Sequence, residues 1–431
     1  MTLVRRWAYS LQSSVKFLYY TPRKGSTTSR DGTSFTAGQP SLLRAINERA
    51  ILELVRTAGV TSRGEIARES GLSKPTVSLA LNGLVTAGLV EEVGRARGGK
   101  GPSAVLYRLN PQAGWVVGID VGRRYVRAAV ADITGKLVAR RDEPAASRSS
   151  TTLVEQIGHV AHQVAGDAGI RWRHVTHATV GHPGVLDPDR GLLAHAPNLP
   201  GWGRQGLVEA IRAQLGTMVS FENDVNLAAL GERADGLGRG VRNFVFLSVG
   251  TGVGAGIVID GRLYRGAGGA AGEVAYLPIG PGDPHDRAHR RRGMLEDSTA
   301  AAGIVEHART LGMARPRTAK AIFAAARRAD PTAVRVVEAE AGRIALAIAT
   351  LAPLLDPELV ILGGGIGMNG DLLLGPIDRE LRAISPFRPT IVVSELGEEA
   401  VLHGAVSTAL SAAQDQLFTR APDLGRREIV V

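Results

Sequence analysis

The chain has 431 residues, which is enough for about three compact units. It contains no cysteine, so disulfides and cysteine-ligated zinc are excluded and a reducing compartment such as the cytoplasm is expected. No apolar run reaches the roughly 18 residues that a membrane span needs, and residues 1–20 lack the apolar stretch and cleavage site of a secretion signal.

The net charge of +10 is concentrated at the start of the chain. Residues 1–110 hold 16 lysines and arginines against 7 acidic residues, whereas the rest of the chain is nearly neutral. A basic block on a neutral body predicts contact with a polyanion, and a solvated basic tail is the alternative. Residues 1–40 are rich in Ser, Thr, Arg and Gly without a sustained period, so we expect a mostly disordered tail there, with a start codon placed too early as the alternative.

Residues 41–112 predict a winged helix-turn-helix domain. Apolar residues recur at helical spacing at its start. A second helix is expected over 63–69, because Ser62 and Glu65 have the spacing of a capping box. A third helix begins near Ser73, and two short strands follow it. Helix, helix, turn, helix and hairpin is the order of a winged helix-turn-helix.

Duplex DNA is the polyanion that such a domain predicts. The third helix enters the major groove in this architecture, and a basic, glycine-rich hairpin can lie along the DNA backbone. Contact with another protein is the alternative use of the same shape. The candidate DNA-binding residues are polar or basic side chains of the third helix and the hairpin: Ser73, Lys74, Thr76, Ser78, Arg95, Arg97 and Lys100.

From residue 113 the pattern alternates between strands and helices, and we expect an α/β domain over 113–412. Two glycine-rich turns, near 118–122 and 250–256, each join strand to strand, which indicates two related lobes that face one ligand. Residues 413–431 are predicted to form a loose tail. The expected strands are 116–120, 126–132, 178–181, 244–249, 256–259 and 359–362, and the expected helices are 153–168, 207–215, 225–234 and 332–355.

Several motifs follow one another in this domain: the turn Gly118–Tyr125, the segment Phe221–Glu232 with its Asn-Asp pair, the glycine turn Ser248–Gly256, and the segments Gly269–Tyr276, Arg292–Glu296 and Leu362–Gly367. In this order they resemble the ROK family (repressors, open reading frames and sugar kinases) over about residues 113–412. With the winged helix before them, the chain is similar to the repressor branch, which includes xylose and N-acetylglucosamine repressors.

The resemblance implies an actin-like, two-lobed ATPase fold with a sugar in its cleft. It implies that Asn198, Asn223 and Asp224 bond sugar hydroxyls, and that Glu273 and Glu296 hold the hydroxyls near the anomeric carbon. In a kinase of the family, the aspartate at the Asp224 position takes the proton from the attacking hydroxyl. Carboxylates and amides suit a sugar because its hydroxyls both donate and accept. A helix N-cap is the alternative role for an Asn or Asp before a helix.

The first phosphate turn departs from the family. Small residues usually follow Asp120 and Gly122, where this chain has Arg123 and Arg124. The two arginines would crowd a nucleotide, or could hold the phosphate of a sugar phosphate, or could point to solvent. The second phosphate turn keeps its small residues, Gly250, Thr251, Gly252 and Gly254. Nucleotide binding therefore stays open, although strand geometry alone can require such glycines.

The zinc site of the family also has no counterpart. Tyr276 stands where the family has a histidine, and the loop that follows has no cysteine. His285 and His289 are four residues apart and could share a helix face, but two histidines make a poor zinc site. We therefore expect neither zinc nor a working ATP cofactor, and Tyr276 can still offer one hydroxyl to the sugar.

Together these features predict a sugar-responsive transcriptional repressor of carbohydrate metabolism genes, without catalytic activity. Its partners would be an operator in double-stranded DNA, a monosaccharide or sugar-phosphate effector, and further copies of the chain as a dimer or tetramer. The alternative is an active sugar kinase, phosphorylating a hexose with ATP, that also carries a DNA-binding domain.

Overall fold

The computed structural model describes residues 40–96, 103–146, 149–187, 192–194, 202–313 and 318–424. Three predicted site residues, Arg97, Lys100 and Asn198, lie outside the described residues, and so does nearly all of the expected tail over 1–40.

The chain divides into two compact units. The N-terminal unit consists of residues 1–113 together with 415–431, and the larger unit consists of residues 114–414. The first division follows residue 113, one residue after the domain boundary expected at 112. Within the described ranges, no helix is long and apolar enough to span a lipid bilayer.

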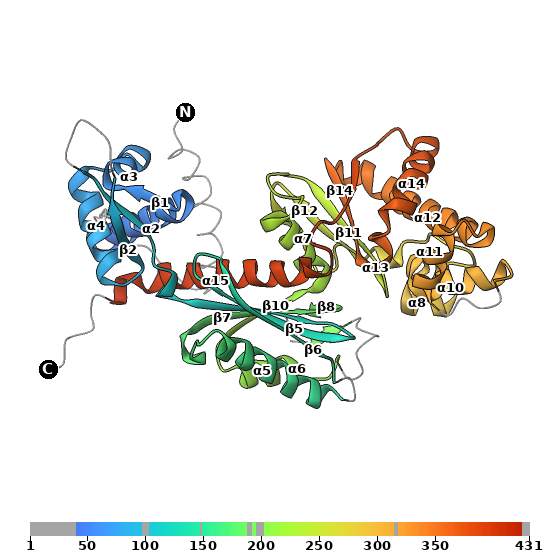
Figure 1. Ribbon diagram of the computed structural model, residues 1–431, viewed down its shortest axis with the longest axis horizontal. Coiled ribbons are helices and arrows are strands. Elements are labelled where there is room, and N and C mark those ends of the chain that lie inside the picture. The colour runs from blue at the N-terminus through green and yellow to red at the C-terminus, as the bar shows by residue number, and fades with distance from the viewer. Residues whose placement is uncertain are drawn as a thin grey trace, which may run out of the picture. The chain divides into compact units, whose positions relative to one another are not determined.

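The described residues between 40 and 113 form three α-helices, a three-stranded sheet and a short 3-10 helix at Pro111–Ala113 (Figure 1). The helices are α2 (Pro40–Ala58), α3 (Arg63–Ser70) and α4 (Lys74–Thr86), and the antiparallel strands are β1 (Val60–Ser62), β2 (Val90–Arg95) and β3 (Val105–Leu109), in the order β1-β3-β2. The predicted helices and hairpin are confirmed. Strand β1 was not predicted, because three residues are too few to show an alternating pattern.

Specific hydrogen bonds hold α3 in this unit. The capping box is present, since Ser62 N donates to the Glu65 carboxylate at 2.8 Å while Ser62 Oγ accepts from Glu65 N. The buried Tyr107 hydroxyl accepts from Arg63 Nε at 2.9 Å and donates to Glu92 at 3.2 Å. This network joins α3 to both strands of the hairpin.

Two five-stranded sheets with the same connectivity organise the larger unit. The strands of the first sheet are β4 (Trp115–Val121), β5 (Tyr125–Asp132), β6 (Leu137–Pro144), β7 (Val175–His182) and β10 (Met218–Asn223), and those of the second are β11 (Phe244–Val249), β12 (Val253–Ile259), β13 (Arg262–Leu263), β14 (Leu359–Gly363) and β15 (Thr390–Val393). The orders are β10-β7-β4-β5-β6 and β15-β14-β11-β12-β13. In both sheets the first three strands are parallel and the last two are antiparallel. The repetition confirms the prediction of two related lobes. A separate hairpin pairs β8 (Val185–Asp187) with β9 (Leu192–Ala194).

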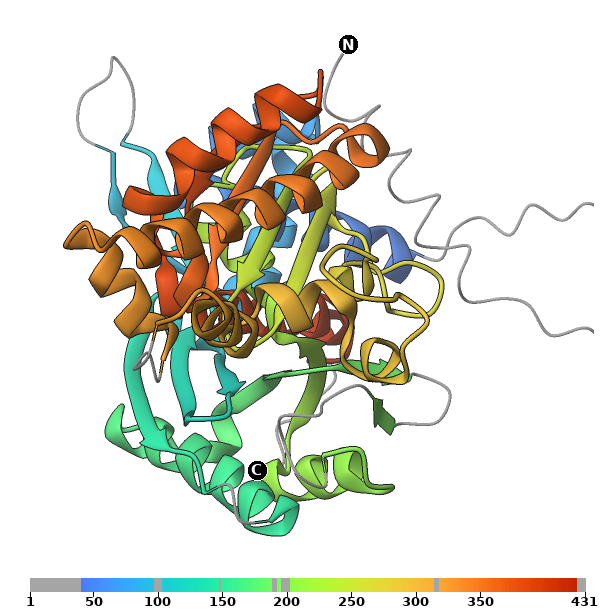
Figure 2. The same cartoon turned by 90° about the vertical axis from the view of Figure 1, so that its right-hand side faces the viewer.

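Helices cover these sheets. On the first sheet, α5 (Ser150–Asp167) and α6 (Leu207–Leu215) lie on one face, while α15 (Ala400–Leu424) crosses the other (Figure 1). Helix α7 (Asp224–Asp235) begins directly after β10 and packs on β11 and β12. The remaining helices belong to the second lobe (Figure 2): α8 (Arg287–Arg292), α9 (Met294–Thr299), α10 (Ala301–Thr310), α11 (Ala319–Arg327), α12 (Pro331–Leu355), α13 (Gly364–Gly367) and α14 (Gly370–Ile384).

The expectation of a loose tail over 413–431 is wrong for residues 413–424, which continue helix α15. Ala405, Ala409 and Ala413 recur every fourth residue and are fully buried. In residues 413–424 polar residues such as Gln414, Asp415 and Gln416 interrupt the apolar pattern, and the alanines carry little apolar signal although they form a helix readily, so the segment had the composition of a tail. Residues 425–431 lie outside the described ranges.

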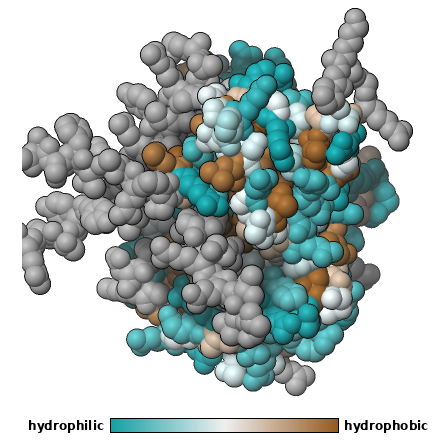
Figure 3. All heavy atoms as spheres, turned by 90° about the vertical axis from the view of Figure 1, so that its left-hand side faces the viewer, coloured by the Kyte–Doolittle hydropathy of each residue, from teal (hydrophilic) through white to brown (hydrophobic). Residues whose placement is uncertain are grey.

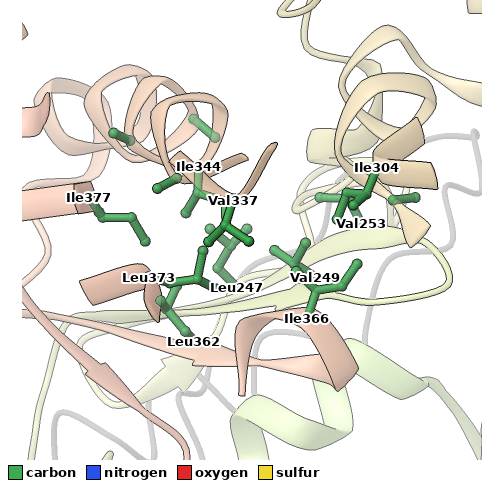
Figure 4. Packing of buried hydrophobic residues seen from close by; sticks show 14 of the residues in the cluster. Leu247, Val249, Val253, Ile304, Val337, Ile344, Leu362, Ile366, Leu373 and Ile377 are labelled. Carbon is green, nitrogen blue, oxygen red and sulfur yellow. The ribbon is translucent and has the colours of Figure 1, made fainter. Parts of the chain in front are cut away.

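Aliphatic side chains between the second sheet and its helices form the largest core. Figure 4 shows Leu247 of β11 and Leu362 of β14 close to Val337 of α12 and Leu373 of α14. On the molecular face drawn in Figure 3, hydrophobic residues form separate patches among hydrophilic ones. The core of the second lobe includes Val249 of β11 and Val253 of β12, the residues on either side of the β11–β12 turn. This packing holds the turn in place.

Candidate functional site

Two strand-to-strand turns, one from each lobe, border the site. Gly122 N donates to Tyr125 O at 2.9 Å and closes the turn between β4 and β5. Gly250 N donates to Gly252 O at 2.9 Å and closes the turn between β11 and β12. The sequence predicted both turns, and the equivalent place of each in its sheet follows from the repeated topology.

A cavity of about 320 Å³ lies between the turns, a volume suited to a small ligand. Its lining includes the described sugar-binding candidates and most of the phosphate-turn candidates: Gly122, Arg123, Asn223, Asp224, Gly250, Thr251, Gly252, Gly254, Glu273, Tyr276 and Glu296. A second cavity of about 520 Å³ shares part of this lining, including Asp224 and Thr251, and is also lined by Asp120 and Arg124. The structure therefore gathers the predicted residues around two adjoining cavities.

Asp224 lines both cavities from the first turn of α7. Its Oδ1 accepts a hydrogen bond from Val225 N at 2.9 Å. Burial, together with the charges of Asp120 and Glu273, raises the pKa of Asp224 to about 7. A carboxyl group with such a pKa can exchange a proton with a bound hydroxyl near neutral pH.

Two glutamates and a tyrosine extend the acidic lining. Glu296 Oε2 accepts from Val253 N at 3.1 Å, which fixes this carboxylate beside the second turn. Burial raises the pKa of Glu296, and the charge of Glu273 adds to the shift. Burial also raises the pKa of Tyr276, with contributions from the charges of Glu273 and Glu296. These groups offer acceptors and a hydroxyl to a ligand that carries several hydroxyls.

Asn223 is the N-cap of α7. Its Oδ1 accepts from Val225 N at 2.9 Å and from Asn226 N at 3.1 Å. Its Nδ2 donates to Gly184 O at 3.1 Å. Most of the amide is therefore engaged in the fold, and one N–H is left for a ligand.

Arg127 is a site residue that was not predicted. It pairs with Asp120 at 3.1 Å, with Asp142 at 3.4 Å and with Glu398 at 2.8 Å. Burial raises the pKa of Asp120, and the Arg127 charge opposes that shift. Asp120 and Arg127 are direct partners across the β4–β5 hairpin, so counting outward from the predicted turn would have revealed the pair.

Besides Arg127, four arginines lie around the cavities. Arg123 lines both of them, and within the described residues it has no hydrogen-bond or ion-pair partner. Arg124 lies 3.7 Å from Glu398 on the exposed side of the second cavity. Arg291 and Arg292, which were not predicted, line the first cavity from the end of α8. Guanidinium groups therefore accompany the carboxylates around both cavities.

The described DNA-binding candidates of α4 and the hairpin differ in their surroundings. Ser73 caps this helix, because its Oγ accepts from Thr76 N at 3.3 Å and lies 2.8 Å from Thr76 Oγ1. The two hydroxyls are thus engaged with each other. Lys74 is exposed and Ser78 is half-buried, and Arg95 is exposed at the end of β2.

Among the described residues, no group of three or more His, Asp or Glu side chains could hold a metal ion. His289 lies 3.1 Å from Asp297. His285 and His289 do not share a helix face as expected, because α8 begins at Arg287, after His285.

Two family models match the chain. The ROK family model matches residues 116–412, and the IclR helix-turn-helix domain model matches residues 42–94. The chain belongs to the ROK family. Its fold is an N-terminal helix-turn-helix domain followed by the two-lobed, actin-like domain of that family.

The relatives of this ROK protein include regulators and kinases. A putative xylose repressor from Caldicellulosiruptor sp. is 28% identical over 397 residues, which cover 87% of this chain and 98% of the relative. A glucokinase from Halalkalibacterium halodurans is 32% identical over 288 residues, which cover 62% of this chain and 86% of the relative.

A solved ROK structure supports the fold of both units. It is a ROK family transcriptional regulator, a homolog of the E. coli MLC protein, and matches with a TM-score of 0.72 at 23% identity. The match covers 88% of this chain and 99% of that structure.

Proposed function

We propose that this ROK protein is a cytoplasmic, sugar-responsive repressor that binds operators of carbohydrate metabolism genes. The observation that carries the proposal is the presence of a helix-turn-helix unit and a carboxylate-lined cavity in one chain. The match to a putative xylose repressor over 87% of the chain supports it, because that relative spans both units.

The effector is a monosaccharide or a sugar phosphate. Asp224, Glu273 and Glu296 offer acceptors for sugar hydroxyls, and Tyr276 adds a hydroxyl. Arg123 lines the same cavity and suits a phosphate group. We propose that the protein uses neither zinc nor ATP as a cofactor.

The effector acts by favouring one state of the protein over another. It shifts DNA binding only if it binds the two states with different affinity. We propose that the protein binds DNA as a homo-oligomer, a dimer or a tetramer, with two helix-turn-helix units on operator half-sites about one helical turn, roughly 34 Å, apart.

Operator release by sugars tests this function. The full chain is first used to select its preferred duplex from a randomised pool, and its affinity is then measured with monosaccharides and sugar phosphates added singly. We expect at least one sugar to weaken operator binding tenfold or more (about 1.4 kcal/mol). A protein that selects an operator but responds to no sugar in the panel would contradict the proposal.

An active sugar kinase is the second candidate. Asp224 occupies the position of the catalytic base in the kinases of the family, and its pKa of about 7 suits that role. The glucokinase relative also supports this candidate. A coupled assay of ATP consumption with each sugar decides between the two: turnover of about 1–100 per second, typical of kinases, would establish the enzyme.

A further inference from the structure

The outward face of α4 is set by its packing. Four residues on one side of this helix are buried in the core of the N-terminal unit: Val77, Ala80, Leu81 and Leu84. The residues opposite them are exposed and follow one another at helical spacing: Pro75, Leu79, Asn82 and Thr86. The buried side fixes the rotation of the helix, so these four residues must form the centre of its free face.

Leu79 is an unusual residue for that position. It is 59% exposed, and no large hydrophobic residue in the described part of the N-terminal unit is more exposed. A leucine in water gains free energy when an apolar group covers it. Its place at the middle of the free face of α4 leaves it accessible to an approaching surface.

Asn82 lies less than one turn further along the same face. Its side chain is exposed, and within the described residues its amide has no hydrogen-bond partner. An amide can donate and accept at once, so it can pair with a base edge that presents both an acceptor and a donor.

The charge of the helix permits close contact with DNA. The sequence of α4 contains no acidic residue, and Lys74 is exposed at its start. The free face therefore meets the phosphate backbone without repulsion from its own side chains. The hydroxyls of Ser73 and Thr76, which the sequence also suggested as DNA-binding groups, lie 2.8 Å apart.

We propose that Leu79 and Asn82 read an A·T-containing step in the major groove of the operator. Leu79 contacts the 5-methyl group of a thymine, which is the apolar feature of that groove. Asn82 pairs with N6 and N7 of an adenine, the usual partner of an asparagine. This inference rests on the proposed function, since it assigns the bases that the repressor reads.

A double-mutant cycle, which combines a protein variant with a base replacement in the DNA, tests the thymine contact. The full chain selects its operator from a randomised duplex pool, and each thymine is then replaced by deoxyuridine, which lacks only the 5-methyl group. For one thymine in a half-site, we expect about a fourfold loss of affinity with the wild-type protein and no further loss with Leu79→Ala. Leu43→Ala is the control, because Leu43 is 56% exposed on α2 and should keep the full deoxyuridine effect.

The adenine contact is tested in the same way. Replacing one adenine by 7-deazaadenine, which lacks the N7 acceptor, should cost the wild-type protein about fivefold or more. The Asn82→Ala protein should be insensitive to the same replacement. Both variants should keep the salt dependence of the wild type, because neither removes a phosphate contact.

Two outcomes overturn the inference in different ways. If every base replacement weakens wild-type and variant proteins equally, the operator is selected but Leu79 and Asn82 do not read it. If the wild-type protein selects no sequence from the pool, the proposed function itself fails, and the base contacts fail with it.

Discussion

At Asp224, opposing effects act on one carboxyl group. Burial and the charges of Asp120 and Glu273 raise its pKa, whereas the hydrogen bond from Val225 N lowers it. The same physics raises the pKa of Glu340, a buried residue of α12, to about 8. Only Asp224 of these two lines the cavities, so the cavity rather than the raised pKa identifies the site.

The raised pKa of Asp224 predicts a pH-dependent stability. Since the folded state holds this proton more tightly than the unfolded chain, the free energy of unfolding falls as pH rises from about 4 to about 7. Asp224→Asn removes that dependence. The free energy of unfolding of this variant should therefore exceed that of the wild type at pH 8, by about 4 kcal/mol at most. The difference should shrink towards pH 4 when both proteins are unfolded by urea.

Asp378→Asn is the control for this pH series. Asp378 forms an exposed pair with Arg382 at 2.8 Å, so its replacement should cause a small change that varies little across the same range. A stability difference for Asp224→Asn that stays constant from pH 4 to pH 8 would show that Asp224 does not carry a raised pKa.

At the scale of single elements, the start of α7 joins structure and site. Asn223 caps the helix, and Asp224 follows as its first residue. Strand β12 packs closely on this helix: a β-carbon on Gly256 would lie 2.7 Å from Val225 O. At that glycine the structure supports a packing requirement, whereas Gly250 and Gly252 shape the turn that borders the cavity.

The capping role of Asn223 predicts a stability effect that depends on the substitute. Asn223→Ala should lower the free energy of unfolding by about 1–2 kcal/mol, because it loses the cap and the bond to Gly184 O. Asn223→Ser can still cap the helix and should recover about half of that loss in urea unfolding. If Asn223→Ala instead weakens effector binding with unchanged stability, the residue is mainly a ligand contact.

The strands that the sequence predicted differ in position from those that it did not predict. The predicted strands β4, β5, β7, β11, β12 and β14 occupy inner positions of their sheets, where continuous burial requires apolar runs. The strands β6, β13 and β15 were missed, and each forms the edge of its sheet. Edge strands carry polar and charged residues, as in the exposed alternation of β6, and so resemble loops.

The same reasoning separates the predicted site residues from those that were missed. Glycine turns and an Asn-Asp pair before a helix are local patterns, and they led to residues that line the cavities. Arg127 and Leu79 carry no local pattern. Their places depend on hairpin register and on the side of α4 that packs inward, which are properties of the folded chain.

At the scale of the whole molecule, effector binding and DNA binding should be separable by mutation. Glu296→Gln removes a charged acceptor from the cavity, so effector affinity should fall by about tenfold to a hundredfold. Operator affinity without effector should stay within about twofold, because the N-terminal unit is untouched. Titration of labelled operator complexes with the active sugar measures both quantities.

Glu306→Gln is the matched control for this experiment. Glu306 lies on α10 in an exposed pair with Arg309 at 3.2 Å, so its replacement should leave the effector response intact. A Glu296→Gln protein that still releases the operator at the wild-type sugar concentration would place the effector elsewhere.

The N-terminal unit should depend on the end of the chain. Leu417 packs against the core of this unit, although it follows the larger unit in sequence. Leu417→Ala should therefore destabilise the N-terminal unit by about 1 kcal/mol in urea unfolding. Asp415→Asn, which weakens an exposed pair with Arg49, should change the stability little, and equal effects of the two variants would contradict the packing role.

The course of the chain limits how this protein can be divided. The backbone passes between the two units once after residue 113 and again after residue 414, within helix α15. A fragment that stops at residue 113 would leave behind the segment that contributes Leu417 to its core. A chimera that exchanges the DNA-binding unit must therefore transplant two separate stretches of sequence. A single fusion joint would leave the new DNA-binding unit without part of its hydrophobic core.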